Sequence, residues 1–187
     1  MSEPVSALNG AMAAGSVTVV DAGLIGMITL RGNLAAPALQ AVCAELAGAG
    51  FPGRLGVSAG DGTAICWMSP DEVLLMLPYA AVSEALTRIA QALTGLHHLA
   101  VDVSDARAVM HLRGPHAREV LAKLTPADLR PGHFGPGIMR RSHLGQVAAA
   151  FRMLDEQNFE VICFRSVADY AFALLAASAK AGPVGYY

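Results

Sequence analysis

Apolar and polar positions along this chain follow two patterns, and these recur in the same order. Short apolar runs bounded by Gly, Pro, Asp or Asn predict strands, whereas apolar positions spaced three and four apart predict helices. The tripeptide Leu30-Arg31-Gly32 ends an apolar run and precedes a helical pattern, and Leu112-Arg113-Gly114 does the same further along. The recurrence predicts two copies of one supersecondary unit.

Each copy continues into a predicted β-hairpin, in which two apolar runs flank an acidic turn. The first hairpin has its turn at residues 69–72 and the second at residues 155–158. A helical pattern follows each hairpin, so the order β-α-β-β-α occurs twice, and residues 98–103 close the first copy as a further strand. Helices on one face of antiparallel sheets predict an α+β fold built from ferredoxin-like repeats.

The domain organisation follows from these repeats. We expect a mobile N-terminal arm over residues 1–19, which are rich in Ala, Gly and Ser, a first repeat over 20–103 and a second over 104–187. The two repeats are expected to share one core. The chain is long enough to bury such a core without disulfides.

A strand-to-helix corner is predicted at Gly114 and Pro115. Gly is an acceptable residue at a helix N-cap, and Pro suits the first helical position, where its missing N–H is no loss. Gly114 and Pro115 are therefore structural candidates, with Gly114 at the N-cap and Pro115 opening the helix.

Composition favours a chain that works with partners. Of its residues 54% are apolar and 15% charged, the mean hydropathy is +0.45 and the net charge is −2. This charge excludes a general nucleic-acid footprint, and no apolar run is long enough for a membrane span. Trp67, Arg140 and Arg141 are the candidate interface residues, although core packing for the Trp and a solvated face for the Arg pair are the simpler readings.

Catalytic, cofactor and metal patterns are missing from the sequence. It has no C-x-x-C, no H-x-x-x-H, no G-x-G-x-x-G after a strand, no P-loop and no G-x-S-x-G. We therefore predict no catalytic, cofactor-binding or metal-binding residue.

The only early charge is Glu3, where a signal peptide has a basic region, so a cytoplasmic location is expected.

An ordered set of motifs carries a family resemblance over residues 55–175. The set comprises Ser69-Pro70-Asp71-Glu72, Asp102-Val-Ser104, Leu112-Arg-Gly114-Pro115-His-Ala117, Val120-Leu121, Asp128-Leu129, Pro136-Gly137, Leu144-Gly145-Gln146-Val147 and Phe164-Arg165-Ser166. It resembles the glycine-cleavage T-protein (folate-binding) superfamily and, more narrowly, the gamma subunits of heterotetrameric sarcosine oxidases.

This resemblance implies an accessory role inside an oxidase. Such complexes contain alpha, beta, gamma and delta subunits, demethylate sarcosine to glycine with peroxide formation, and pass the one-carbon unit to tetrahydrofolate. It further implies that FAD, FMN, NAD and tetrahydrofolate reside in partner subunits and that the gamma chain contacts mainly alpha. Where the wider superfamily often places acidic residues after Leu144-Gly145, this chain has Gln146 and no carboxylate until Asp155, which argues against aminomethyl transfer.

Two other functions are compatible with the sequence. One is a stand-alone folate-binding enzyme or carrier of T-protein type, which would need a pterin pocket with a buried carboxylate. The other is an unrelated protein-interaction module with a ferredoxin-like fold.

Overall fold

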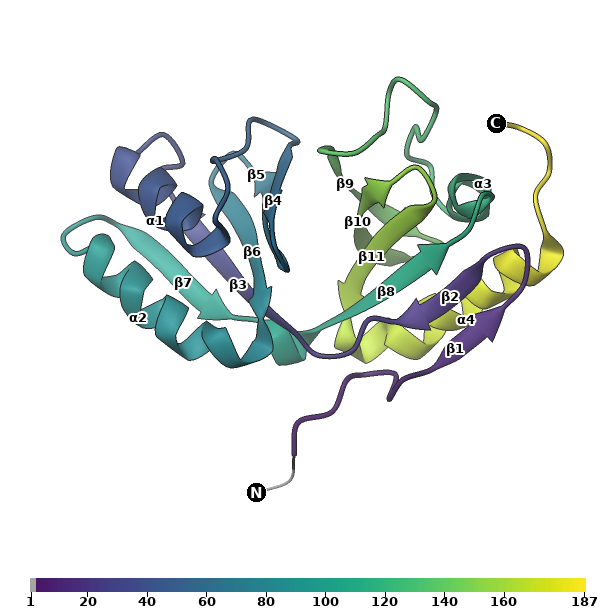
Figure 1. The fold of residues 1–187 in the computed structure, drawn as a ribbon, viewed down its shortest axis with the longest axis horizontal. Coiled ribbons are helices and arrows are strands. Elements are labelled where there is room, and N and C mark those ends of the chain that lie inside the picture. The colour runs from purple at the N-terminus through teal and green to yellow at the C-terminus, as the bar shows by residue number, and fades with distance from the viewer. Residues whose placement is uncertain (1–2) are drawn as a thin grey trace. The chain divides into compact units, whose positions relative to one another are not determined.

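The computed structural model describes residues 3–187 and divides them into two compact units. The inserted unit is formed by residues 25–104. The terminal unit combines residues 3–24 with residues 105–187. Each unit has one antiparallel sheet and two α-helices (Figure 1), so the α+β class predicted from the sequence is confirmed.

The inserted unit contains the first repeat. Its sheet has the strand order β4-β5-β6-β3-β7, and both of its helices pack on the strands of this sheet. The elements are β3 (Ile25–Gly32), α1 (Pro37–Ala47), β4 (Val57–Gly60), β5 (Thr63–Ser69), β6 (Glu72–Pro78), the 3-10 turn η1 (Tyr79–Ala81), α2 (Val82–Ala92) and β7 (His98–Asp102).

Local sequence explains where the first helices begin and end. Pro37 occupies the start of α1, where no N–H is needed, and Gly48 ends the helix in the left-handed conformation (φ 60°), its N–H reaching the carbonyls of the last turn. In α2 the buried residues Val82, Ala85 and Ile89 recur at helical spacing and face the core.

The terminal unit contains the second repeat. Its sheet has the order β1-β2-β8-β11-β10-β9. The elements are β1 (Met12–Ala14), β2 (Thr18–Asp21), η2 (Ser104–Ala106, which begins at the last residue of the inserted unit), β8 (Arg107–Arg113), α3 (Ala117–Ala122), β9 (Met139–Leu144), β10 (Val147–Asp155), β11 (Asn158–Phe164), η3 (Arg165–Val167) and α4 (Ala168–Ala181).

Strand register shows that the two sheets share one plan. Both predicted hairpins are present, and each has a register shift in the same place, between Trp67 and Ser69 in the first and between Met153 and Asp155 in the second. In each sheet the second hairpin strand pairs with the strand that opens the repeat. Each repeat also has a short strand before its hairpin, β4 or β9, which the predicted β-α-β-β-α order does not include.

The N-terminal segment is part of the terminal sheet, which corrects the prediction of a mobile arm over residues 1–19. β2 pairs with β8, and β1 pairs with β2. The Asp21 carboxylate accepts hydrogen bonds from Ser6 Oγ and from the Gly10 N–H (2.9 Å), and Arg165 donates to the Val5 carbonyl at 3.0 Å. These bonds tie residues 5–21 to the terminal unit. Residues 1 and 2 lie outside the described part of the chain.

The buried apolar residues form two clusters, one in each unit, instead of the single shared core predicted from the sequence. In the inserted unit the cluster centres on Ile28, Leu75 and Ile89, and in the terminal unit on Phe151 and Phe159. The helices of each unit cover one face of their own sheet, so each sheet builds its own core.

The buried face of α4 also differs from the predicted one. The apolar spacing in this segment predicts a core face of Val167, Tyr170, Ala171, Leu174 and Ala177. Ala171 is buried as predicted, but Tyr170 is 41% exposed, and Ala168, Leu175 and Ala179 complete the buried face. Small side chains along this face let the helix lie close to the sheet. No helix formed by residues 3–187 is both long and apolar enough to cross a membrane.

Candidate functional site

The predicted corner at Gly114 and Pro115 is present, but its cap is shifted. α3 begins at Ala117 with His116 at the N-cap, so Pro115 lies before the helix and not at its first position. Gly114 has φ +138°, its N–H donates to the Gln157 carbonyl at 2.9 Å, and its carbonyl accepts from the Ala117 N–H at 3.1 Å. The corner therefore needs Gly for its backbone conformation.

Trp67 lies on β5 at the rim of a groove in the inserted unit. Its side chain is half-buried, and the groove, of about 390 Å³, is also lined by Phe51, Pro52 and Arg54. The residue is therefore neither a core residue nor fully exposed.

Arg140 and Arg141 do not form one basic spot. They are neighbours on β9 and point to opposite faces of the sheet. Arg140 donates to the His133 carbonyl at 3.0 Å and lies over the Phe134 ring at 5.8 Å, whereas Arg141 is exposed.

A charged network occupies the terminal sheet on the face opposite its core. Arg152 Nε donates to Glu160 Oε1 at 2.7 Å, and His111 Nε2 lies 3.4 Å from Glu160 Oε2. Arg113 extends the network to His111 Nδ1 at 3.1 Å. Burial raises the pKa of Glu160, but the bonds from His111 and the charge of Arg152 lower it, and the net direction is downward. The carboxylate is thus held ionised as a structural partner.

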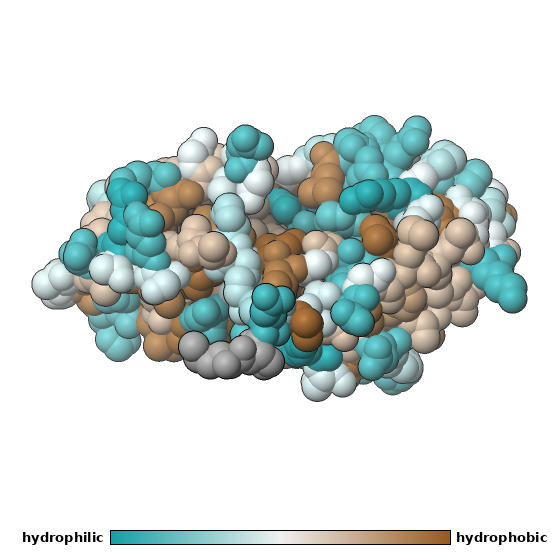
Figure 2. All heavy atoms as spheres, turned by 60° about the horizontal axis from the view of Figure 1, so that its bottom comes forward, coloured by the Kyte–Doolittle hydropathy of each residue, from teal (hydrophilic) through white to brown (hydrophobic). Residues whose placement is uncertain are grey.

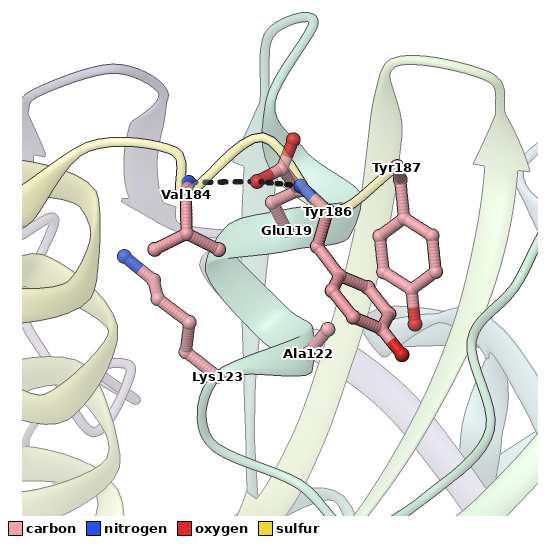
Figure 3. A pocket seen from close by; sticks show the side chains of 6 residues that line it. All are labelled: Glu119, Ala122, Lys123, Val184, Tyr186 and Tyr187. Atoms are coloured by element: carbon pink, nitrogen blue, oxygen red, sulfur yellow. Dashed lines mark hydrogen bonds between the residues drawn. The ribbon is translucent and has the colours of Figure 1, made fainter.

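A second carboxylate, Glu119 on α3, holds the C-terminal segment (Figure 3). Its Oε2 accepts the backbone N–H groups of Val184 (2.7 Å), Gly185 (2.8 Å) and Tyr186 (3.3 Å). Burial raises the pKa of Glu119, but these donors outweigh it and lower the pKa overall.

Lys123, at the C-terminal end of α3, also holds the C-terminal segment, so that Glu119 and Lys123 together form a clasp around it. Its Nζ donates to the carbonyls of Ser178 and Gly182, at 2.7 Å each. A cavity of about 240 Å³ lies between α3 and the tail and is lined by Glu119, Lys123 and the two terminal Tyr residues among others. The two charged groups of this cavity, on Glu119 and Lys123, already bond to the C-terminal segment. Nothing in the sequence pattern pointed to this clasp.

The three thiols are buried, and three of the four helices in the described part of the chain carry an acidic residue in the first turn. Cys43, Cys66 and Cys163 are buried, and burial raises the pKa of Cys43 to about 12 and that of Cys163 to about 11. Within residues 3–187, no group of three His, Cys, Asp or Glu side chains could hold a metal ion. α2 and α4 carry Glu84 and Asp169 in their first turns, which disfavours a dinucleotide phosphate there.

Comparison with known proteins identifies the family. The model described as "Sarcosine oxidase, gamma subunit family" matches residues 31–181. The chain belongs to the sarcosine oxidase gamma subunit family. The gamma subunits of sarcosine oxidase from Corynebacterium sp. (strain P-1) and from an Arthrobacter species are each 35% identical to it over 164 residues, which cover 85% of this chain and 80% of each relative.

Two solved structures have a fold similar to that of this chain. A chain of the heterotetrameric sarcosine oxidase from Corynebacterium sp. U-96, solved in complex with pyrrole 2-carboxylate, superposes with a TM-score of 0.80 at 28% identity, covering 91% of this chain and 88% of that one. The glycine-cleavage aminomethyltransferase T from Bartonella henselae shares the fold at 13% identity, with a TM-score of 0.57 over 83% of this chain and 44% of that one. The predicted T-protein-like fold is confirmed.

Proposed function

We propose that this chain is a non-catalytic accessory subunit of a cytoplasmic heterotetrameric sarcosine oxidase. The observation that carries the proposal is its likeness, at 28% identity over 91% of its length, to a chain of such an oxidase. The resemblance stated above implies that FAD, FMN, NAD and tetrahydrofolate belong to the partner subunits, and the acidic first turns of α2 and α4 support this.

A folate-dependent role of this chain itself is disfavoured by how its buried carboxylates are used. Four carboxylates are buried within residues 3–187. Glu160 is bonded to Arg152 and His111, Glu119 to the C-terminal segment, Glu72 to Arg31, and Asp21 to the Gly10 N–H. All four are engaged within the chain, so none is placed to hold a pterin or polarise an amine. Gln146, at the position where relatives often have an acid, lies exposed in the turn between β9 and β10.

We propose that the partner subunits contact exposed residues outside the two buried clusters. On the face drawn in Figure 2, hydrophobic residues form several separate patches divided by hydrophilic ones. We propose Trp67 and Arg141 as contact residues for the partner subunits, mainly alpha, because the first lies beside a groove and the second is exposed. Arg140, also predicted as an interface residue, contributes through the loop that it holds by the His133 carbonyl.

Co-expression with the three other oxidase subunits tests the proposal. The tag is placed on this chain, and an unrelated tagged chain serves as the control. We expect the flavoprotein subunits to elute with it in equal amounts and to form peroxide with sarcosine, and omission of the chain to reduce assembly. Normal assembly and turnover without it, together with no binding to the other subunits, would refute the proposal.

A further inference from the structure

The strand β7 forms one edge of the inserted sheet (Figure 1). It pairs with β3 on one side, and residues 3–187 provide no strand on the other. A row of backbone N–H and C=O groups without a strand partner is a template for pairing with another chain. We therefore asked which groups of β7 face outward and whether the side chains beside them suit a partner.

The hydrogen bonds to β3 show which backbone groups of β7 point away from the sheet. The Val103 N–H donates to the Met27 carbonyl at 2.8 Å, in the register that pairs Thr29 with Val101 and Arg31 with Leu99. In an antiparallel ladder the bonds come from alternate residues, so Leu99 and Val101 bond inward to β3. The backbone groups of His98, Ala100 and Asp102 therefore point away from the sheet.

The hydrogen bonds between β3 and its other neighbour, β6, indicate the same alternation. The Gly32 N–H donates to the Asp71 carbonyl at 2.9 Å, which assigns the even-numbered residues of β3 to β6. Its odd-numbered residues, among them Met27, are left to bond β7. The alternation is thus supported by two separate bonds.

Apolar side chains accompany this open backbone edge. Leu99 is 54% exposed and Val101 is 40% exposed, while Ala100 between them packs toward the core. Because side chains alternate along a strand, Leu99 and Val101 lie on one face. Leu96, just before the strand, is a further exposed apolar residue.

The other sheet edges are protected in ways that β7 is not. β9 carries Arg140, Arg141 and His143, and charged edges disfavour pairing with other strands. β1 has three residues and β4 has four, so both offer short templates. The five residues of β7 have an uncharged centre.

We propose that β7 binds an extended segment of a partner subunit of the oxidase by strand addition. The segment has apolar residues at two alternate positions, which pack on Leu99 and Val101, and its backbone bonds to His98, Ala100 and Asp102. Only an extended chain matches donors and acceptors spaced in this way. This inference rests on the proposed function and names the surface that would serve it.

Two variants probe the edge in the co-expressed complex. Leu99→Glu combined with Val101→Lys removes the apolar pair without changing net charge, and Ala100→Pro removes an outward N–H that β3 does not use. Met12→Lys, at a 70% exposed residue on another edge, is the matched control. We expect each β7 variant to weaken binding at least about tenfold, as loss of an interface hot spot does, with the control unchanged.

Thermal unfolding of the variants and binding of the wild-type chain distinguish a folding defect from a binding defect. Thermal unfolding of each isolated variant shows whether the chain still folds, and a folded variant with wild-type affinity overturns the inference. If the wild-type chain fails to bind the oxidase subunits at all, the proposed function fails instead.

Amide hydrogen exchange tests strand addition directly and needs no variant. In the complex we expect new protection at His98, Ala100 and Asp102, while Leu99 and Val101 are already protected in the free chain. Unchanged exchange at the three outward amides would overturn the inference. A self-associated chain whose dimer is lost in the β7 variants would overturn it as well, since the occupant would then be a second copy.

Discussion

Arg152 and Glu160 form a buried ion pair across β10 and β11, with Nε and Oε1 2.7 Å apart and side chains 10% and 4% exposed. The equivalent cross-strand pair in the first repeat is Cys66 with Leu74, which is apolar. The same position in the same hairpin plan is thus filled once by charges and once by an uncharged pair.

Removing one partner of this pair should be costly. Arg152→Met leaves the Glu160 carboxylate buried beside fewer donors, and we expect a loss of about 3–5 kcal/mol in the free energy of unfolding. Arg152→Met combined with Glu160→Leu, which resembles the first repeat, should restore most of it. Denaturant unfolding measures both. Equal losses in the single and double variants would show that the charges are not coupled.

Acid should weaken the wild-type chain more than this double variant. The pKa of Glu160 is lowered in the folded state, so its stabilisation is present above the ordinary Glu pKa of about 4.3 and is lost as pH falls through the folded pKa. Unfolding free energies measured from about pH 6 downward should converge in the acid range. Parallel curves would contradict the assignment.

Gly114→Val should destabilise the terminal unit by about 1–3 kcal/mol because a β-branched residue is strained at φ +138°. An added Cβ meets Val17 at 3.4 Å, an ordinary contact, so the cost comes from the backbone. His116→Ala should be mild, since its side chain makes no cap bond. A shift in melting temperature for Gly114→Val no larger than that for His116→Ala would refute the prediction.

Gly15→Ala should also be destabilising, for a steric reason. A Cβ there would lie 2.5 Å from the backbone carbonyl of Ala179 near the end of α4, and forcing atoms into packed space costs about 1–3 kcal/mol. Gly50→Ala, where nothing lies within 4 Å of the added Cβ, is the control. Thermal unfolding of the two variants side by side should show a loss for Gly15→Ala alone.

Glu119→Gln should loosen the C-terminal segment without unfolding the chain. The variant loses the charge that three backbone N–H groups share. We expect faster amide exchange at Val184, Gly185 and Tyr186. Glu156→Gln, at a side chain that is 78% exposed, should leave those rates unchanged. Wild-type exchange at the three amides in Glu119→Gln would show that the clasp does not depend on the charge.

The central elements of both repeats could be predicted from the sequence because their apolar periodicity is local. The hairpins around residues 69–72 and 155–158 and the helices after them are continuous patterns of this kind. The corner at Gly114 was predictable too, because Gly followed by Pro stops a strand. The family motifs pointed to the T-protein-like fold because their order along the chain can be recognised without knowing the tertiary structure.

Tertiary structure alone decided the features that depend on distant pairing. β2 becomes a strand because it pairs with β8, far along the chain, although its local composition suggested a mobile arm. β4 and β9 are edge strands with little apolar alternation, so only their neighbours define them. The burial of Leu175 in place of Tyr170 depends on how α4 packs on its sheet. The division into two cores depends on which residues each sheet brings together in space.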